Sequence, residues 1–227
     1  LQGFSLRVER GVSCAVIGAS GCGKTTLLYA LSGLVLPLSG HILIDGEPLT
    51  AVRSRTSLIL QDYGLLPWKT VRQNLLFPLR SRGLGQSDSR NKADRVLSDL
   101  GILDQAEKFP GTLSGGQRQR VAIGRALVLE PDLLLMDEAS SALDTVTRES
   151  IQNLVLGICR KQNLTLVLVT HSIEEAAFLG QKIVIMGQGC IRHSIDNPYF
   201  GITQVRDTDA FYNLCRKIRR LLYDENT

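Results

Sequence analysis

Long apolar runs and a strong excess of one charge are both missing from this sequence of 227 residues. No apolar stretch approaches the roughly 18 residues that cross a bilayer, so we expect any link to a membrane to run through a partner protein. Lys and Arg number 26 against 22 for Asp and Glu, and the net charge of +4 is too small to indicate nucleic-acid binding. The composition therefore points away from integral membrane proteins and from nucleic-acid-binding domains.

Paired cysteines are missing as well. The five cysteines are scattered, and none of them forms a C-x-x-C motif: Cys14, Cys22, Cys159, Cys190 and Cys215. An odd, unclustered set argues against a disulfide framework and against structural zinc. Cys14 and Cys159 stand among apolar neighbours, which indicates small core residues. We therefore expect a reduced protein of the cytoplasm.

What the sequence does contain is an alternation of short apolar runs and helical patterns. The runs predict strands, several buried on both faces of a sheet, at residues 13–17, 41–44, 56–60, 132–136, 164–169 and 182–186. Helical periodicity follows at residues 24–31, 116–127, 145–160 and 173–179. Strands and helices in alternation predict an α/β core around a mostly parallel sheet.

Between residues 61 and 130 the pattern changes. Residues 71–79 and 91–100 read as amphipathic helices, and the polar stretch 81–90, with its two glycines, reads as a loop. After residue 195 an apolar stripe faces four basic residues, which predicts a terminal helix that either docks on the core or touches acidic lipid. We expect a core (residues 1–66 and 129–195), an inserted helical subdomain (67–128) and a tail (196–227).

The strongest local signal is a glycine-rich loop between a predicted strand and a predicted helix. It fits the pattern G-x-x-x-x-G-K-[ST] with Gly18, Ala19, Ser20, Gly21, Cys22, Gly23, Lys24 and Thr25. The glycines let successive N–H groups face an anion, and the helix N-terminus adds partial positive charge. We expect Lys24 to contact the β- and γ-phosphates, Thr25 to hold Mg²⁺, and Thr26 to contact the phosphates near the α position. The loop predicts binding of a nucleoside triphosphate.

Polar residues follow three predicted strands. Asp137 and Glu138 end a buried strand, and because neighbours along a strand face opposite ways, they cannot share one role. We expect Asp137 to hold Mg²⁺ and Glu138 to act as general base toward water. Gln61 and His171 follow two other strands, so they should reach the same crevice. There Gln61 can offer an amide oxygen to Mg²⁺, and His171 is a candidate catalytic residue.

A second motif consists of Leu113, Ser114, Gly115, Gly116 and Gln117. With the phosphate loop it resembles the nucleotide-binding subunit of ATP-binding cassette (ABC) transporters, over about residues 1–195. The resemblance implies a RecA-like P-loop NTPase fold with an inserted helical subdomain, and a Mg²⁺-dependent ATPase activity. It also implies a Q-loop at Gln61, a switch histidine at His171, and a D-loop at Ser141, Ala142, Leu143 and Asp144.

The resemblance implies partners too. In the family two subunits share each site, so Ser114, Gly115, Gly116 and Gln117 would act in trans on the nucleotide of the other subunit of a homodimer. Ser114 could equally be a plain helix cap, and both roles can coexist because they use the same free N–H groups. Further partners would be a transmembrane permease and, through it, a periplasmic or lipid-anchored solute-binding protein. The chain would then be peripheral, on the cytoplasmic face of the inner membrane, without nucleic acid.

A narrower resemblance covers residues 61–71, 170–176 and 211–222. These are similar to the ATPases of bacterial nitrate, sulfonate and taurine importers, and of importers of thiamine precursors. Leu65, Leu66, Pro67 and Trp68 would suit the contact that the family makes with its permease, although apolar residues of a helical region can equally be core. The function expected is therefore that of an importer ATPase. A non-transport cassette ATPase and a regulatory module without hydrolysis are the alternatives.

Two departures from the family carry expectations of their own. Ala139 and Ser140 stand where relatives usually have Pro and a bulky residue. In the family a further strand with an adenine-stacking aromatic lies upstream of the position that Leu1 occupies, and Phe4 is expected on the buried face of a strand. We therefore expect binding chiefly through the triphosphate and Mg²⁺, with little preference for ATP over GTP. A bulky thiol reagent on Cys22 should block the nucleotide.

Overall fold

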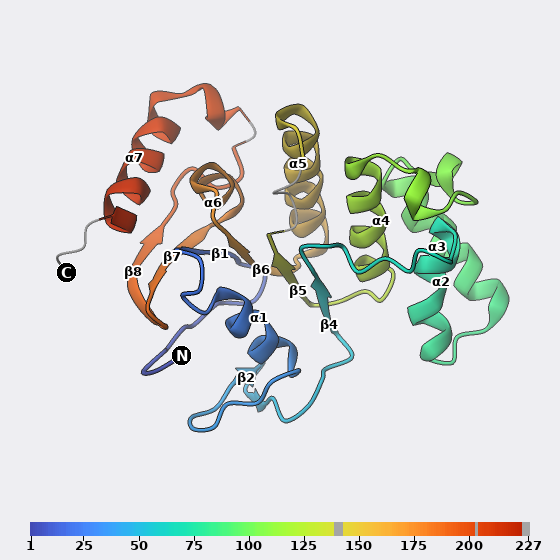
Figure 1. The fold of residues 1–227 in the computed structure, drawn as a ribbon, viewed down its shortest axis with the longest axis horizontal. Helices are drawn as coiled ribbons and strands as arrows, with labels where there is room; N and C mark the ends of the chain where they lie inside the picture. The colour runs from blue at the N-terminus through green and yellow to red at the C-terminus, as the bar shows by residue number, and fades with distance from the viewer. Residues whose placement is uncertain (139–142, 203, 224–227) are drawn as a thin grey trace.

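A six-stranded sheet with the order β4-β5-β6-β1-β7-β8 forms the centre of the protein (Figure 1). The structure, a computed structural model, describes residues 1–138, 143–202 and 204–223. All neighbouring strands run parallel except β7 and β8, which pair antiparallel. This confirms the predicted α/β fold. The strands are β1 (Ser13–Gly18), β4 (Thr56–Ile59), β5 (Leu133–Asp137), β6 (Thr165–Thr170), β7 (Lys182–Gly187) and β8 (Cys190–Asp196).

Side chains of the central strands alternate between two hydrophobic clusters, one on each face of the sheet. In β1, Ala15 and Ile17 belong to the first cluster, and Cys14 and Val16 to the second. Both faces are covered, which explains why these strands are apolar almost without interruption. The buried thiol of Cys14 has its pKa raised to about 12 by burial. None of the five cysteines forms a disulfide, as predicted.

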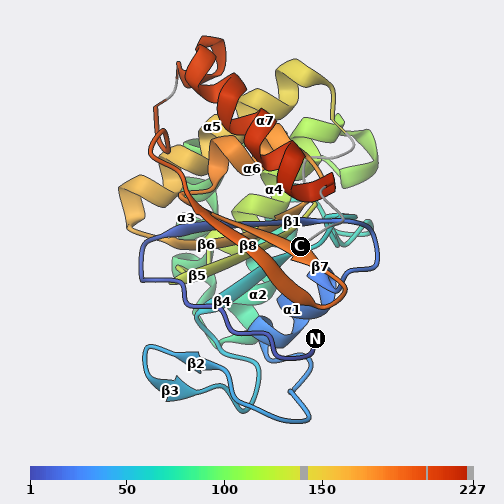
Figure 2. The ribbon, with the colours of Figure 1, turned by 90° about the vertical axis from the view of Figure 1, so that its left-hand side faces the viewer.

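Seven helices of the described chain cover the sheet or extend it. On the face of the second cluster lies α1 (Lys24–Ser32). Residues of the other helices all enter the first cluster, and Figures 1 and 2 show α5, α6 and α7 on that side. These helices are α2 (Val71–Ser81), α3 (Gln86–Asp99), α4 (Gly115–Leu127), α5 (Thr145–Gln162), α6 (Ile173–Leu179) and α7 (Asp209–Tyr223). Within the described residues, no helix is long and apolar enough to span a bilayer.

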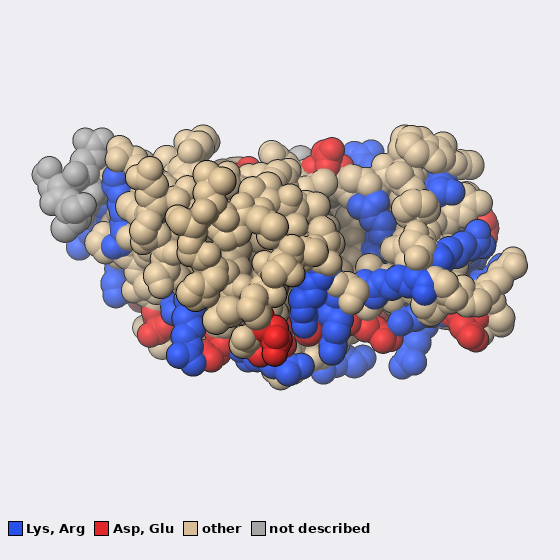
Figure 3. Space-filling model, turned by 90° about the horizontal axis from the view of Figure 1, so that it is seen from below, with Lys and Arg blue, Asp and Glu red and all other residues tan. Residues whose placement is uncertain are grey.

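The region between α1 and β4 differs from its prediction. Instead of one strand at residues 41–44, a two-stranded ribbon pairs β2 (Leu43–Ile44) with β3 (Glu47–Pro48), apart from the main sheet. The reason is the Asp45-Gly46 turn, in which both residues have positive φ, of 53° and 84°. From below, the molecule shows a broad surface without charged side chains (Figure 3). The region between α1 and β4 exposes six large apolar side chains: Leu34, Val35, Leu36, Leu38, Leu43 and Val52.

Three other boundaries also differ from the sequence prediction. The expected loop at residues 81–90 shrinks to 82–85, because Gly83 ends the preceding turn at φ 77° and Gly85 is the N-cap of α3. Strand β8 was not predicted, and it follows a tight turn at Gln188 and Gly189. Residues 4–8 form no strand, and Phe4, which is half-buried, packs on the second cluster.

The helical part and the tail both join the first cluster. Helices α2, α3 and α4 lie together beyond the edge strand β4 (Figure 1), and Ser57 of β4 donates to the carbonyl of Ala126 at 3.0 Å. Two short 3-10 helices, η1 (Leu103–Gln105) and η2 (Pro110–Thr112), connect α3 to α4. A third, η3 (Val205–Asp207), precedes α7, which buries Phe211, Leu214 and Ile218. The tail is thus docked, with its basic residues outward.

Candidate functional site

The glycine-rich loop joins the end of β1 to the start of α1, as predicted. Gly21 and Gly23 have φ of 80° and 102°, where other residues would be strained. Gly18 is needed for a different reason, since a Cβ there would come within 2.5 Å of the Met186 carbonyl oxygen. Gly23 is the N-cap of α1, and no side chain caps this helix. Its first N–H groups therefore remain available to an anion.

The ammonium group of Lys24 lies inside this loop. It donates to the carbonyl oxygens of Gly18 at 2.8 Å and Ala19 at 3.0 Å, and the residue is 7% exposed. The ion pairs found among the described residues do not include Lys24. A buried charge with neutral partners alone is costly, and an anion would offset that cost. The remaining loop positions, Ala19, Ser20, Gly21, Thr25 and Thr26, are exposed.

Cys22 differs from its expected place. The residue is 7% exposed and belongs to the second hydrophobic cluster together with Val184 and Met186. A Cβ on Gly18 would lie 2.8 Å from the Cys22 sulfur, so the thiol sits beneath the loop. It can contribute its N–H group to a phosphate, but its side chain is not presented to a reagent at the surface. The expected reactivity toward bulky thiol reagents therefore does not follow from this geometry.

Asp137 and Thr25 meet at the carboxyl end of β5. The Thr25 hydroxyl donates to Asp137 Oδ1 at 3.4 Å, and Asp137 is 7% exposed. Burial raises the pKa of Asp137, the charge of Glu138 adds to this, and the Thr25 hydrogen bond and Lys24 oppose it. Hydroxyl and carboxylate oxygens are ligands that Mg²⁺ prefers. No cluster of three or more His, Cys, Asp or Glu forms a metal site in the described residues, so a Mg²⁺ ion here would share its shell with phosphates and water.

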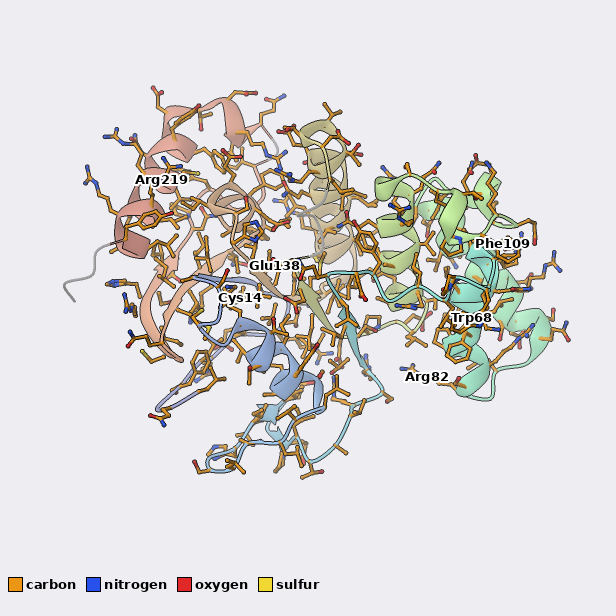
Figure 4. All side chains as sticks on the ribbon, in the orientation of Figure 1. Cys14, Trp68, Arg82, Phe109, Glu138 and Arg219 are labelled. Carbon is orange, nitrogen blue, oxygen red and sulfur yellow. The ribbon has the colours of Figure 1, made fainter. Side chains whose placement is uncertain are left out.

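Glu138 and His171 come together at the ends of neighbouring strands. His171 Nδ1 lies 3.1 Å from Glu138 Oε2, and the Glu138 side chain is 20% exposed against 59% for His171. Figure 4 labels Glu138 in the middle of the molecule, where β5 ends. Its φ of 45° is unusual for a residue other than glycine, and such strain gathers at functional sites. The predicted convergence of two strand ends is present.

Gln61 lies exposed, two residues beyond β4, and the turn that follows it is held from α4. Tyr63 and Gly64 have φ of 65° and 54°. Arg125 donates to the carbonyl oxygens of both, at 2.8 Å for Tyr63. Burial lowers the pKa of Arg125, and Asp62 opposes this shift. Sequence reasoning missed Arg125, because one basic residue in a helix carries no signal of a partner about 60 positions away.

The second motif forms the N-terminus of α4. Ser114 Oγ accepts from the Gln117 N–H at 3.3 Å, and Gln117 Oε1 accepts from the Ser114 N–H at 2.9 Å, which makes a capping box. Gly115 and Gly116 allow close packing on residues next to and within α5, since a Cβ would clash with Leu143 or Thr147. Residues of α1 belong to the second hydrophobic cluster and residues of α4 to the first, so these two helices lie on opposite faces of the sheet.

The predicted D-loop is described only in part. Ser141, with Ala139, Ser140 and Ala142, lies outside the described residues. Asp144 is the N-cap of α5 and accepts from the Thr147 N–H at 3.0 Å. Hydrogen bonds from Thr147 hold the pKa of Asp144 below its ordinary value.

Comparison with known proteins agrees with this geometry. The family described as ABC transporter matches residues 1–141. An aliphatic sulfonates import ATP-binding protein of Agrobacterium fabrum is 40% identical over 228 residues, covering 100% of this chain and 85% of the relative. A taurine import ATP-binding protein of Pseudomonas aeruginosa is 42% identical over 186 residues, covering 82% of this chain and 71% of the relative.

Solved structures give the same result. The cbiO1 protein of Clostridium perfringens, part of an ABC transporter complex, superposes with a TM-score of 0.80 at 29% identity, over 88% of this chain and 82% of its own. A dimeric ATP-binding cassette in a post-hydrolysis state with ADP and phosphate reaches 0.76 at 29% identity, over 85% and 88%. With the open helix N-terminus, the buried lysine and the two strand-end carboxylates, these matches show that the chain belongs to the ABC transporter family and is an ATP-binding subunit with ATPase activity.

Proposed function

We propose that this chain hydrolyses ATP with Glu138 as general base and thereby drives uptake of a solute through a membrane permease. The observation that carries this proposal is the contact of 3.1 Å between Glu138 Oε2 and His171 Nδ1. It holds a partly exposed carboxylate in a strained backbone position, directly after the strand that ends in Asp137. A carboxylate fixed in this way can take a proton from an attacking water.

The other residues divide the work of holding the nucleotide. The N–H groups of the loop from Gly18 to Thr26 and the ammonium of Lys24 bind the phosphates. Thr25 and Asp137, with the amide oxygen of Gln61, hold Mg²⁺, which when bound supplies positive charge that offsets the charge of the phosphates. His171 orients Glu138 through Nδ1. These groups fit Mg-ATP because Thr25 and Asp137 already lie 3.4 Å apart and Lys24 lacks an anionic partner within ion-pair distance among the described residues.

A homodimer completes the site in this proposal. Ser114, Gly115, Gly116 and Gln117 of one subunit would face the nucleotide held by the other, and Asp144 and Ser141 would lie at the same interface. Two features support it: α1 and α4 pack on opposite faces of the sheet within one chain, and a similar cassette is described as dimeric. We further propose the division into a core (1–66 and 129–195), a helical subdomain (67–128) and a tail (196–227).

The permease contact is proposed at the outer end of the helical part. Trp68 is 70% exposed and Pro67 is exposed, whereas Leu65 and Leu66 are half-buried (Figure 4). A cavity of about 350 Å³ opens beside them. Its lining includes Phe77, the basic residues Lys69, Arg72, Arg80 and Arg90, and Glu107, which forms an ion pair with Arg72. An exposed aromatic next to a basic hollow suits a protein partner with apolar and acidic side chains.

The relatives narrow the proposed solute. Those named above are import ATP-binding proteins for aliphatic sulfonates and taurine, so we propose an organosulfonate or a chemically similar solute, with nitrate and thiamine precursors as further candidates. Delivery would come from a periplasmic or lipid-anchored solute-binding protein. The chain itself would work at the cytoplasmic face of the inner membrane, bound to its permease.

The substitution Glu138→Gln tests the proposal. The amide keeps the shape but cannot accept the proton, so turnover should fall by roughly 100-fold or more, the lower range for general-base catalysis. Binding of ATP should persist, and the variant should accumulate as an ATP-bound dimer on a sizing column. Glu9→Gln, an exposed change outside the site, is the control and should leave turnover as it is. Near-normal hydrolysis by Glu138→Gln would contradict the assignment.

A further inference from the structure

A buried polar chain joins the tail to two helices beside the proposed catalytic groups. Arg206, in η3, donates to Gln152 Oε1 on α5, and Gln152 Nε2 donates to Glu175 Oε1 on α6 at 3.3 Å. Gln152 is 5% exposed and Glu175 is 6% exposed. A guanidinium can only donate and a carboxylate can only accept, so the amide between them has one favourable orientation. Glutamine is the residue type that serves both neighbours here.

Arg206 is held on both helices at once. Its guanidinium carbon lies 3.6 Å from the centre of the Phe178 ring on α6, and Nη1 lies 3.9 Å from Glu149 Oε2 on α5. Burial lowers the pKa of Arg206, and Glu149 opposes this shift. Desolvated polar groups of this kind are costly unless every partner is in place, so the network favours one relative position of η3, α5 and α6.

The hydrogen-bonded series of Arg206, Gln152 and Glu175 ends in the first turn of α6, which follows His171 in the sequence. Glu175 lies in the first turn of α6, and its N–H donates to Ser172 Oγ, the N-cap, at 3.2 Å. The Ser172 N–H in turn donates to Thr170 Oγ1 at 3.0 Å. His171 lies between Thr170 and Ser172, so a displacement of Glu175 is passed to the backbone on either side of His171.

We propose that the chain of Arg206, Gln152 and Glu175 positions His171 against Glu138, and that the C-terminal segment thereby sets the rate of ATP hydrolysis. The inference rests on the proposed roles of Glu138 and His171. Arg206 and Gln152 are positioning residues: they act through α6 and touch neither nucleotide nor water. Because η3 leads directly into α7, a partner that moves α7 would alter turnover through Arg206.

The alternative is a purely structural tail anchor, and Gln152 separates the two. Gln152→Glu keeps an acceptor for Arg206 but sets a carboxylate against Glu175, so the tail stays attached while the hydrogen bond from residue 152 to Glu175 is lost. Val155 is buried on the same helix, and Val155→Ala should loosen packing without changing a residue of the polar series of Arg206, Gln152 and Glu175. It serves as the stability-matched control.

The experiment compares kcat, the KM for ATP and Tm for the purified full chain. For Gln152→Glu we expect kcat to fall by up to roughly 100-fold, the loss that a misplacement of about 1 Å can cause, with KM within about twofold of the original. Arg206→Met should behave alike, and Arg206→Lys, which keeps a charge over the Phe178 ring, should recover part of the loss. Val155→Ala should keep its kcat at a matched loss of Tm.

A double-mutant cycle sharpens the test. Added to His171→Ala, Gln152→Glu should cost little of the residual turnover, because the group it positions is gone. The proposal is overturned if Gln152→Glu keeps full kcat, or if Val155→Ala loses as much kcat for the same loss of Tm. Either result contradicts only the positioning proposal, provided that Glu138→Gln is inactive. If Glu138→Gln is active, the proposed function itself is contradicted.

Discussion

The helices α1 and α4 both begin with glycine-containing motifs, yet their N-termini are completed in opposite ways. The N-cap of α1 is Gly23, and no side chain accepts from its first turn. The N-cap of α4 is Ser114, which forms a capping box with Gln117. Helix α2 begins like α4, with a capping box of Thr70 and Gln73. Among these three, α1 alone leaves its first N–H groups without a side-chain partner.

The difference shows which end depends on a ligand. In the proposed site, the uncapped helix N-terminus beside the buried ammonium of Lys24 would form an anion receptor within a single chain. The capped N-terminus of α4 is stable without a ligand, so it can remain at an exposed surface until a second subunit approaches. In the proposed dimer the first end binds the nucleotide strongly, and the second makes a weaker contact that follows binding.

The largest expected effect is that of Lys24→Ala, which should break the anion receptor at α1. Loss of a charged donor to the phosphates should weaken ATP binding roughly 10- to 150-fold, the range for hydrogen bonds to charged groups. The nucleotide-free protein should not lose Tm, because the substitution also removes the cost of a buried ammonium whose hydrogen-bond partners are neutral carbonyl groups. Calorimetric titration of ATP measures this, with Lys161→Ala as an exposed control. Unchanged affinity in Lys24→Ala would show that the loop binds phosphate through its N–H groups alone.

Local patterns allowed most of this comparison to be predicted. The phosphate loop is contiguous, its glycines have a local backbone reason, and a strand before it and a helix after it complete the signal. The capping box also follows from a serine and a glutamine three positions apart. The sheet was predicted because its central strands are buried on both faces, whereas β8 and the first turn of α3 are half-exposed and carry weak periodicity.

Contacts between distant residues could not be predicted in the same way. Arg125 holds the turn at Tyr63 and Gly64, and Arg206 reaches Gln152, but in each pair the partners are more than 50 positions apart. Nothing in the neighbouring sequence marks them: the backbone carbonyl groups that Arg125 contacts can belong to any residue type, and one glutamine in a helix does not indicate which residue it will bond. The burial of Cys22 was missed for a related reason, since it depends on β7 packing beneath the loop.

An intermediate effect is expected at the N-terminus of α4. There Ser114→Asp distinguishes the role of Ser114 as a helix cap from its proposed contact with the nucleotide of the other subunit. Asp is a good N-cap, so Tm should change little, but its charge would repel a phosphate of the other subunit. Ser114→Ala should instead lose about 1 kcal/mol of stability with no added repulsion. Hydrolysis should therefore fall by at least about tenfold in Ser114→Asp, because like charges at an interface cost more than the roughly 1.4 kcal/mol that a factor of ten represents, and less in Ser114→Ala.

The matched control for this pair is Thr70→Asp, the same kind of change at the N-cap of α2. It should leave hydrolysis unchanged. In a Glu138→Gln background, Ser114→Asp should also abolish the ATP-dependent dimer on a sizing column. A stable dimer in that double variant would mean that Ser114 is a cap and nothing more.

The smallest expected effect concerns the carboxylates near the two ends. Asp137, beside α1, has a pKa raised by burial, whereas Asp144, beside the first turn of α4, has a pKa lowered by hydrogen bonds from Thr147. A raised folded-state pKa means that ionised Asp137 costs stability, fully at pH values above that pKa and not at all below the unfolded one. Asp137→Asn should thus raise Tm at neutral pH, because it removes a buried charge, while hydrolysis is lost.

The change in Tm caused by Asp137→Asn should depend on pH. The gain in Asp137→Asn should shrink as pH falls through the raised pKa, because the native carboxyl then becomes neutral as well. Asp144→Asn should do the opposite at neutral pH and lower Tm, because a depressed pKa contributes stability that is present above the unfolded value and lost as pH falls through the folded one. Thermal melts of the nucleotide-free proteins between about pH 4 and pH 8 cover the carboxylate range. If Asp137→Asn lowered Tm at neutral pH, as Asp144→Asn should, the α1 end would not carry the proposed electrostatic cost.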